Sequence, residues 1–157
     1  MEINELLSRP ADEFGNDESL EEMWAAKAFE HAEIYFNLLC SVDPKLLQLT
    51  QIDNTIYTIF REEFPKLDVQ LINEDNMKGA TGKVKWRLFC DRFKDIIEDY
   101  NFGTLMRADC TGEYSENNSM LVPRIQFLAI ELARNREGLN DGLRDKYKGQ
   151  KTTKQEE

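Results

Sequence analysis

The sequence is poor in the residues from which metal sites and disulfide frameworks are built. Its 157 residues include a single histidine and three cysteines, Cys40, Cys90 and Cys110. An odd number of widely spaced cysteines is typical of reduced thiols in a reducing compartment. His31 and the three cysteines could in principle supply four zinc ligands, but no pair has the C-x-x-C spacing of a zinc site. We therefore expect no bound metal.

Long apolar runs are also absent from the sequence. No stretch approaches the ~20 apolar residues that a helix needs to span a bilayer, and the acidic N-terminal region lacks the pattern of a secretory signal. We therefore expect no membrane association. The expected location is the cytoplasm, with the nucleus as a second compartment.

The short motifs of common catalytic sites are missing as well. The chain has no P-loop, no Gly-x-Gly-x-x-Gly loop and no Gly-x-Ser-x-Gly nucleophile elbow. The one histidine, His31, falls at helical spacing on an apolar face beside Trp24, Tyr35 and Leu38. A histidine in that position is more often a hydrogen-bonded core residue than a catalytic base. We expect no catalytic residue and no cofactor, and therefore a protein that acts by binding other proteins.

Basic residues are too few to balance the acidic ones, and the formal net charge is −10. Concentrated Lys and Arg side chains are needed to bind a phosphate backbone, so direct nucleic-acid binding is not expected. Residues 12–33 are strongly acidic, whereas the C-terminal third is rich in Lys and Arg. Three interpretations stay open: both regions are solvated faces, they pair with each other, or they address a partner of mixed charge.

What the sequence does contain is a series of helical patterns with two short alternating segments. Capping residues and apolar spacing predict helices over residues 19–40, 44–49, 50–63, 83–100 and 123–137, and alternation predicts strands over 67–72 and 102–110. We expect the two strands to pair in an antiparallel way. The resulting fold class is α+β, with four to five helices and a two- to three-stranded antiparallel sheet.

The domain organisation follows from where apolar residues begin and end. Residues 1–18 are expected to form a loosely ordered acidic arm, residues 19–148 a single α+β domain, and residues 149–157 a disordered Lys-rich tail. The domain is expected to be monomeric.

The stretch around which the fold is organised is residues 120–138. Pro123 suits a helix start and Gly138 a left-handed stop. Leu121 and four later residues form one apolar stripe, and Phe127 with Ile130 adds a second apolar side. Two interpretations follow: the helix is central, with layers packed on both sides, or its second side is offered to a partner.

Several segments together resemble the polysaccharide biosynthesis domain-containing protein 1 family. The resemblance covers residues 11–140 in register. The matching segments are 13–17 (EFGND), 24–25 (WA), 31–33 (HAE), 41–44 (SVDP), 56–57 (IY), 85–87 (KWR), 98–105 (EDYNFGTL), 107–110 (RADC) and 123–127 (PRIQF) through 133–138 (ARNREG).

This resemblance implies a cotranslational chaperone rather than an enzyme. Members like this chain are understood to bind the nascent GTP-binding domain of translation elongation factor 1A at the ribosome, together with the nascent polypeptide-associated complex. The family label also suggests a small transferase or hydrolase in polysaccharide biosynthesis, although the glycine-rich cofactor loop of the methyltransferase-like proteins that share the label is missing. A passive protein-interaction scaffold is the third alternative.

Nine residues in the arm, before the second strand and on the central helix are the expected partner contacts. They are Phe14, Asn16, Tyr100, Asn101, Arg124, Phe127, Ile130, Arg134 and Arg136. Trp24 is expected to be a further apolar anchor. We expect reversing the charge of Arg134 and Arg136 to weaken partner binding without unfolding the protein. We expect His31→Ala, in contrast, to destabilise the fold.

Overall fold

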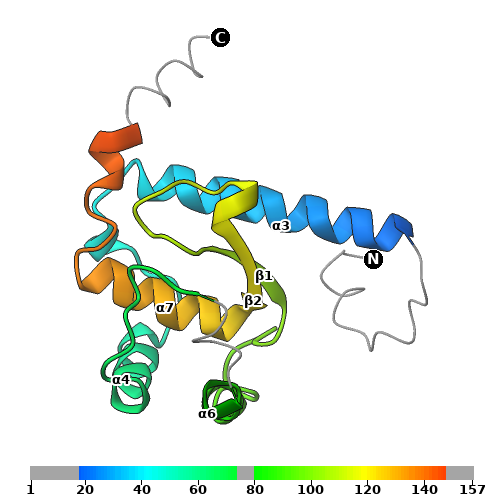
Figure 1. The fold of residues 1–157 in the computed structure, drawn as a ribbon, viewed down its shortest axis with the longest axis vertical. Coiled ribbons are helices and arrows are strands. Elements are labelled where there is room, and N and C mark those ends of the chain that lie inside the picture. The colour runs from blue at the N-terminus through cyan, green and yellow to red at the C-terminus, as the bar shows by residue number, and fades with distance from the viewer. Residues whose placement is uncertain (1–17, 74–79, 148–157) are drawn as a thin grey trace.

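The computed structural model describes residues 18–73 and 80–147. Its longest element is helix α3 (Glu18–Leu39), which runs along one side of the fold, and helix α7 (Arg124–Arg136) lies in the middle (Figure 1). Helix α3 confirms the prediction over 19–40. A short 3-10 helix η1 (Pro44–Leu46), helix α4 (Asp53–Glu63) and helix α6 (Ala80–Asp91) complete the helical part before the sheet. The α+β fold class is confirmed.

The sheet consists of strands β1 (Gly103–Arg107) and β2 (Ser119–Pro123), joined through the 3-10 helix η2 (Glu116–Asn118). The strands are antiparallel, with Gly103 opposite Pro123 and Arg107 opposite Ser119. The predicted strand over 102–110 is therefore confirmed in its central part. The prediction that residues 67–72 form its partner strand is wrong.

The segment 67–72 forms only one isolated antiparallel bridge, between Leu71 and Asp109. The alternation that suggested a strand does not continue, because Leu71 is 54% exposed whereas Ile72 is buried. Two backbone hydrogen bonds, from Ile72 N to Ala108 O and from Cys110 N to the carbonyl of residue 70, attach this segment to the end of β1.

The predicted helix over 123–137 starts one residue later than expected. Pro123 is the N-cap, with an extended backbone at φ −59° and ψ 146°, and Arg124 is the first helical residue. Val122 precedes a proline, which disfavours helical geometry, so residues 119–123 pair with β1 instead. Leu121 is 51% exposed on this strand, so its assignment to the apolar stripe of the helix is wrong. The predicted stop is confirmed, since Gly138 has φ +82°.

The predicted helix over 83–100 is wrong in its second half. Helix α6 ends at Asp91, and residues 92–100 follow as tight turns. Their hydrogen bonds run mainly to the third preceding residue, as from Arg92 N to Phe89 O and from Phe93 N to Cys90 O. Phe93 is nevertheless buried, so the apolar pattern predicted burial correctly and helix length incorrectly.

The predicted capping is confirmed at the start of η1, but α4 begins at Asp53, three residues after its predicted start at residue 50, and its N-cap Ile52 makes no side-chain hydrogen bond. The Asp43 side chain accepts a hydrogen bond from Lys45 N at the start of η1. Before α4, the Asp53 carboxylate accepts from the backbone N–H groups of Leu49 and Thr50, at 2.8 and 2.7 Å, and from the Thr50 hydroxyl. The carboxylate therefore fixes the turn from which α4 begins.

The hydrophobic core surrounds α7, which packs against α4, α6, η1 and both strands. Every residue from Ile125 to Asn135 is buried. The interpretation of a central helix with layers on both sides is therefore confirmed. No helix among the described residues is long and apolar enough to cross a membrane.

The expected core position of His31 is wrong. The side chain lies at the edge of the core face of α3, where it remains partly exposed to solvent. Its ring lies edge-on to Phe127 at a centroid distance of 5.8 Å. The core face of α3 consists instead of Ala28, Ala32 and Leu39, with Tyr35 beside them. Alanines at these positions let α3 approach its neighbours closely.

Candidate functional site

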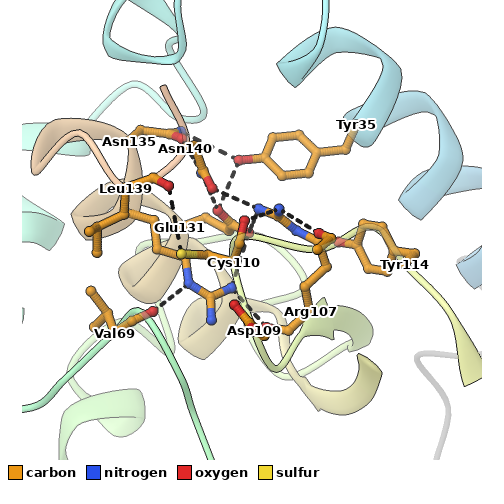
Figure 2. A network of polar contacts seen from close by, with 12 residues as sticks. Tyr35, Val69, Arg107, Asp109, Cys110, Tyr114, Glu131, Asn135, Leu139 and Asn140 are labelled. Carbon is orange, nitrogen blue, oxygen red and sulfur yellow. Dashed lines mark hydrogen bonds and ion pairs between the residues drawn. The ribbon is translucent and has the colours of Figure 1, made fainter. Parts of the chain in front are cut away.

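The most concentrated polar chemistry of the protein is a buried network centred on Glu131 of α7 (Figure 2). Both side-chain oxygens of Glu131 accept hydrogen bonds, Oε1 from Arg107 at 3.1 Å and Oε2 from Asn140 at 3.1 Å and from the Tyr35 hydroxyl at 3.4 Å. Arg134 completes the network, with its Nη1 atom 3.4 Å from Oε1 of Glu131. Glu131, Arg107 and Arg134 are fully buried.

The network carries two guanidinium groups for one carboxylate. The additional positive charge is solvated by backbone carbonyls, because Arg134 donates to Val69 O at 2.7 Å, to Arg107 O at 2.8 Å and to Ala108 O at 3.0 Å. Arg107 donates to Cys110 O at 2.7 Å. The two arginines therefore join α7 to the end of β1 and to the segment before α6.

The titration behaviour of these groups follows from burial and from their neighbours. Burial opposes ionisation of Glu131, but Arg107 and Arg134 outweigh it and lower the pKa of that carboxyl. Burial and the nearby Glu131 charge raise the pKa of Tyr35 well above its ordinary value, and the same two causes raise the pKa of Tyr114. Glu131 is therefore ionised and both tyrosines are neutral at neutral pH.

This network has the shifted pKa values of an active site but not its accessibility. Its charged groups are occupied with one another and with backbone carbonyls, and a buried charge is stable only when it is compensated in this way. We interpret it as the structural centre of the fold. Among the described residues, no group of three or more His, Cys, Asp or Glu side chains could hold a metal ion. The three cysteines form no disulfide and are buried, and burial raises the pKa of Cys90 to about 11.

The structure separates the residues predicted to contact a partner. Phe14 and Asn16 lie outside the described residues. Phe127, Ile130 and Arg134 are buried, so the expectation that they form an accessible surface is wrong. The side chain of Arg134 is turned inward because the carbonyls at the end of β1 need a donor.

Four predicted contacts remain accessible, but they lie in different places. Tyr100 and Asn101 line a groove between α6 and β2, together with the exposed Leu121. Arg124 lies at the start of α7 and lines a different pocket. Arg136 is exposed at the other end of α7, with its guanidinium 5.3 Å from the centre of the Tyr57 ring. No single surface contains them all.

The sequence reasoning missed an exposed apolar surface on α3. Phe29 is 64% exposed, Ile34 61% and Leu38 42%, and a helical arrangement places the exposed Glu30 and Glu33 between Phe29 and Ile34. We call these five residues the α3 outer face. Its charged residues face away from the buried Ala32 side of the same helix, with Phe29 at one edge of the face and Leu38 at the other, about half a turn apart. The signal was present in the sequence, because the apolar residues of α3 occupy more of the helix than one core face can bury.

Comparisons with known proteins place this chain in a family. A family model described as PBDC1 protein matches residues 20–145. Protein PBDC1 of Mus musculus is 48% identical over 143 residues, which are 91% of this chain and 72% of that protein. Protein PBDC1 of Homo sapiens is 48% identical over 137 residues, which are 87% of this chain and 59% of that protein.

The relatives extend to yeasts and include a solved structure. The PBDC1 homolog of Saccharomyces cerevisiae is 44% identical over 137 residues, covering 85% of this chain and 94% of that protein. A solution NMR structure of a Saccharomyces cerevisiae protein has 42% identity and a TM-score of 0.77, covering 88% of this chain and 97% of that chain. The α+β architecture organised around α7 is thus shared with an experimentally determined fold, and the chain belongs to the PBDC1 protein family.

Proposed function

We propose that this protein is a non-enzymatic, ATP-independent chaperone that binds the nascent GTP-binding domain of translation elongation factor 1A. The observation that carries the proposal is the α3 outer face, on which Phe29, Ile34 and Leu38 remain exposed on a well-formed helix. Exposed apolar side chains next to charged ones are typical of protein-binding surfaces. A folding client exposes apolar surface of its own, which such a face can cover until the client is folded.

The charge of this face supports a basic client. Glu30 and Glu33 lie among the apolar side chains, and the whole chain has a net charge of −10. Complementary charge accelerates association and disfavours acidic competitors. The exposed side of α6 also carries apolar residues, Val84 and Leu88, but its charged neighbours include Lys83 and Arg87. A basic client is therefore expected to bind α3 in preference to α6.

The proposed client and its setting follow from the family resemblance described in the sequence analysis. The resemblance described above assigns to such proteins a place at the ribosome beside the nascent polypeptide-associated complex. In this proposal the protein acts as a monomer in the cytoplasm, and it meets elongation factor 1A before the GTP-binding domain has folded.

The enzymatic alternative, a transferase or hydrolase in polysaccharide biosynthesis, has less support. The most strongly raised pKa values belong to Tyr35 and Tyr114 of the buried network and to Cys90, a buried thiol that burial makes harder to ionise. An enzyme needs such groups where a substrate can reach them. A passive scaffold remains the alternative if binding leaves folding of the client unchanged.

The test is a pull-down of ribosome–nascent chain complexes from a translating lysate, read by mass spectrometry. The informative variant is Ile34→Asp with Leu38→Asp, which places two charges on the α3 outer face. Val84→Asp with Leu88→Asp is the matched control, because these two residues are also exposed, four positions apart and on one helix.

The proposal predicts that the wild-type protein and the α6 control recover nascent elongation factor 1A together with the nascent polypeptide-associated complex. The α3 variant should lose most of that recovery while its unfolding transition stays unchanged. Loss of recovery in the α6 variant alone would place the client on the other helix. Recovery of sugar-metabolising enzymes without elongation factor would contradict the proposed function.

A further inference from the structure

A pocket of about 200 Å³ lies between α3, the start of β1 and the start of α7. Its apolar wall includes Phe102, Phe127 and Leu128. The close approach of α3 to the sheet requires a glycine at this point, because a Cβ atom on Gly103 would lie 2.9 Å from the Trp24 ring. The wall is therefore formed by elements that the fold holds tightly together.

Three cationic or titratable basic side chains line the same pocket. Lys27 and His31 come from consecutive turns of α3, and Arg124 comes from the first position of α7. Among the described residues, neither Lys27 nor Arg124 forms an ion pair with a carboxylate. Asp99, on the turn before β1, is the one carboxylate among the described lining residues.

The convergence of these charges is unusual for this protein. The chain carries 30 acidic residues against 20 basic ones, so a group of basic side chains that lacks ion pairs is not what its composition favours. Burial lowers the pKa of His31, and the positive charges of Arg124 and Lys27 lower it further. Both cations are thus close enough to the imidazole to oppose its protonation.

From this arrangement we infer that the pocket binds a small organic anion, a phosphate or carboxylate carried on a compact apolar group. Lys27, His31 and Arg124 would bind the anionic head, and Phe102, Phe127 and Leu128 would contact the apolar part. A carboxylate or phosphate among these groups would replace a repulsive interaction by an attractive one. The size of the pocket limits the size of the ligand, because the pocket is smaller than the roughly 300–1,000 Å³ of sites for drug-sized molecules.

The inference is independent of the proposed chaperone function. It concerns a pocket rather than the α3 outer face, and it can be tested on the isolated full-length chain without a client. The shared chemistry is the anionic head, so inorganic phosphate and phenyl phosphate serve as probes. Phenol serves as the neutral control that keeps the aromatic group.

The single histidine makes the measurement direct, because one set of imidazole NMR signals reports on the pocket. The His31 signals are followed against pH in phenyl phosphate, in inorganic phosphate, and in chloride at equal ionic strength. A bound anion should raise the His31 pKa by about one unit, the effect expected of an opposite charge within ~4–6 Å. The shift should saturate with phenyl phosphate at lower concentration than with inorganic phosphate, and phenol should leave the pKa unchanged.

Variants separate this site from general charge effects. Lys27→Gln with Arg124→Gln should abolish the saturable shift, whereas Lys83→Gln with Arg87→Gln, which removes two positive charges from α6, should leave it intact. An equal His31 pKa in phosphate and chloride would overturn the inference, and that result needs no variant. A shift that grows without saturation, or that the α6 variant also loses, would overturn it as well.

Discussion

Helices α7 and α3 place their side chains in opposite ways. Helix α7 buries charged residues, since Glu131 and Arg134 are inaccessible in the middle of the fold. Helix α3 exposes apolar residues, since Phe29 and Ile34 are each more than 60% exposed. Burial of charge is costly unless every group is compensated, and exposure of large apolar side chains is useful when a partner covers them.

This difference separates structure from function within one small domain. On α7 the charged residues join strands, loops and helix into one unit, and their replacement acts on stability. On α3 the outer face contributes little to the core, and its replacement acts on binding. The location of the basic pocket between the two helices fits this division, because Lys27 and His31 come from α3 and Arg124 from the accessible start of α7, not from its buried middle.

The largest expected effect comes from breaking the buried network. Arg134→Ala removes one of the two guanidinium groups beside Glu131, takes the Arg134 donor from the Val69 carbonyl, and leaves the Ala108 carbonyl with Ile72 N as its remaining donor. We expect the free energy of unfolding to fall by about 3–5 kcal/mol, the cost of removing one member of a buried ion pair. Chemical denaturation monitored by circular dichroism measures it.

Arg136→Ala is the matched control, because Arg136 is exposed two residues further along the same helix. Its unfolding free energy should stay within about 0.5 kcal/mol of the wild type. Equal effects of the two substitutions would contradict the structural role of Arg134. The earlier expectation that both arginines can be reversed without unfolding the protein does not hold for Arg134.

The second effect is on acid stability. The folded protein holds the pKa of Glu131 below its ordinary value, so this carboxylate stabilises the fold above about pH 4.3, its unfolded pKa. The contribution is lost as the pH falls through the lower, folded value. Glu131→Gln should therefore destabilise the protein at pH 7, because Arg107 and Arg134 lose the carboxylate that both of them pair with, even though the amide keeps an acceptor oxygen.

The measurement is the unfolding free energy of both proteins between pH 7 and the acid transition. The difference between wild type and Glu131→Gln should shrink as the pH falls. A difference that is constant across this range would show that ionisation of Glu131 does not stabilise the fold.

The smallest expected effects on the unfolding free energy come from substitutions on the two sides of α3. Ala32 is buried, so Ala32→Leu should cost about 1–3 kcal/mol through overpacking. Ile34→Ala, on the outer face, creates no cavity and should change the unfolding free energy by no more than about 0.5 kcal/mol. Thermal unfolding of the two variants provides the comparison. A larger loss for Ile34→Ala than for Ala32→Leu would mean that the assigned sides are reversed.

Local patterns predicted much of this fold. The cap at Asp43 and the left-handed Gly138 lie where local signals predict them, because these signals act within a few residues, whereas α4 begins three residues later than predicted. The pairing of β1 with β2 was missed because Leu121 fitted a helical stripe. The effect of Pro123 on the residue before it was the stronger signal.

The site was less predictable than the fold. Glu131 is a polar residue on an apolar helix, and its partner Arg107 lies 24 residues earlier in the chain, so only tertiary structure brings the two together. Arg134 was predicted to be accessible because a charged residue at a helix end usually is. The α3 outer face was missed since one amphipathic pattern was assigned to a single core side.

Hydrogen–deuterium exchange of the protein, free and bound to the newly synthesised GTP-binding domain of elongation factor 1A, tests the central claim most directly. The account predicts that client binding slows exchange in peptides covering residues 29–38 of α3 and leaves residues 80–91 of α6 unchanged. Slower exchange along α6 and β2, with α3 unaffected, would contradict the assignment of function to the α3 outer face.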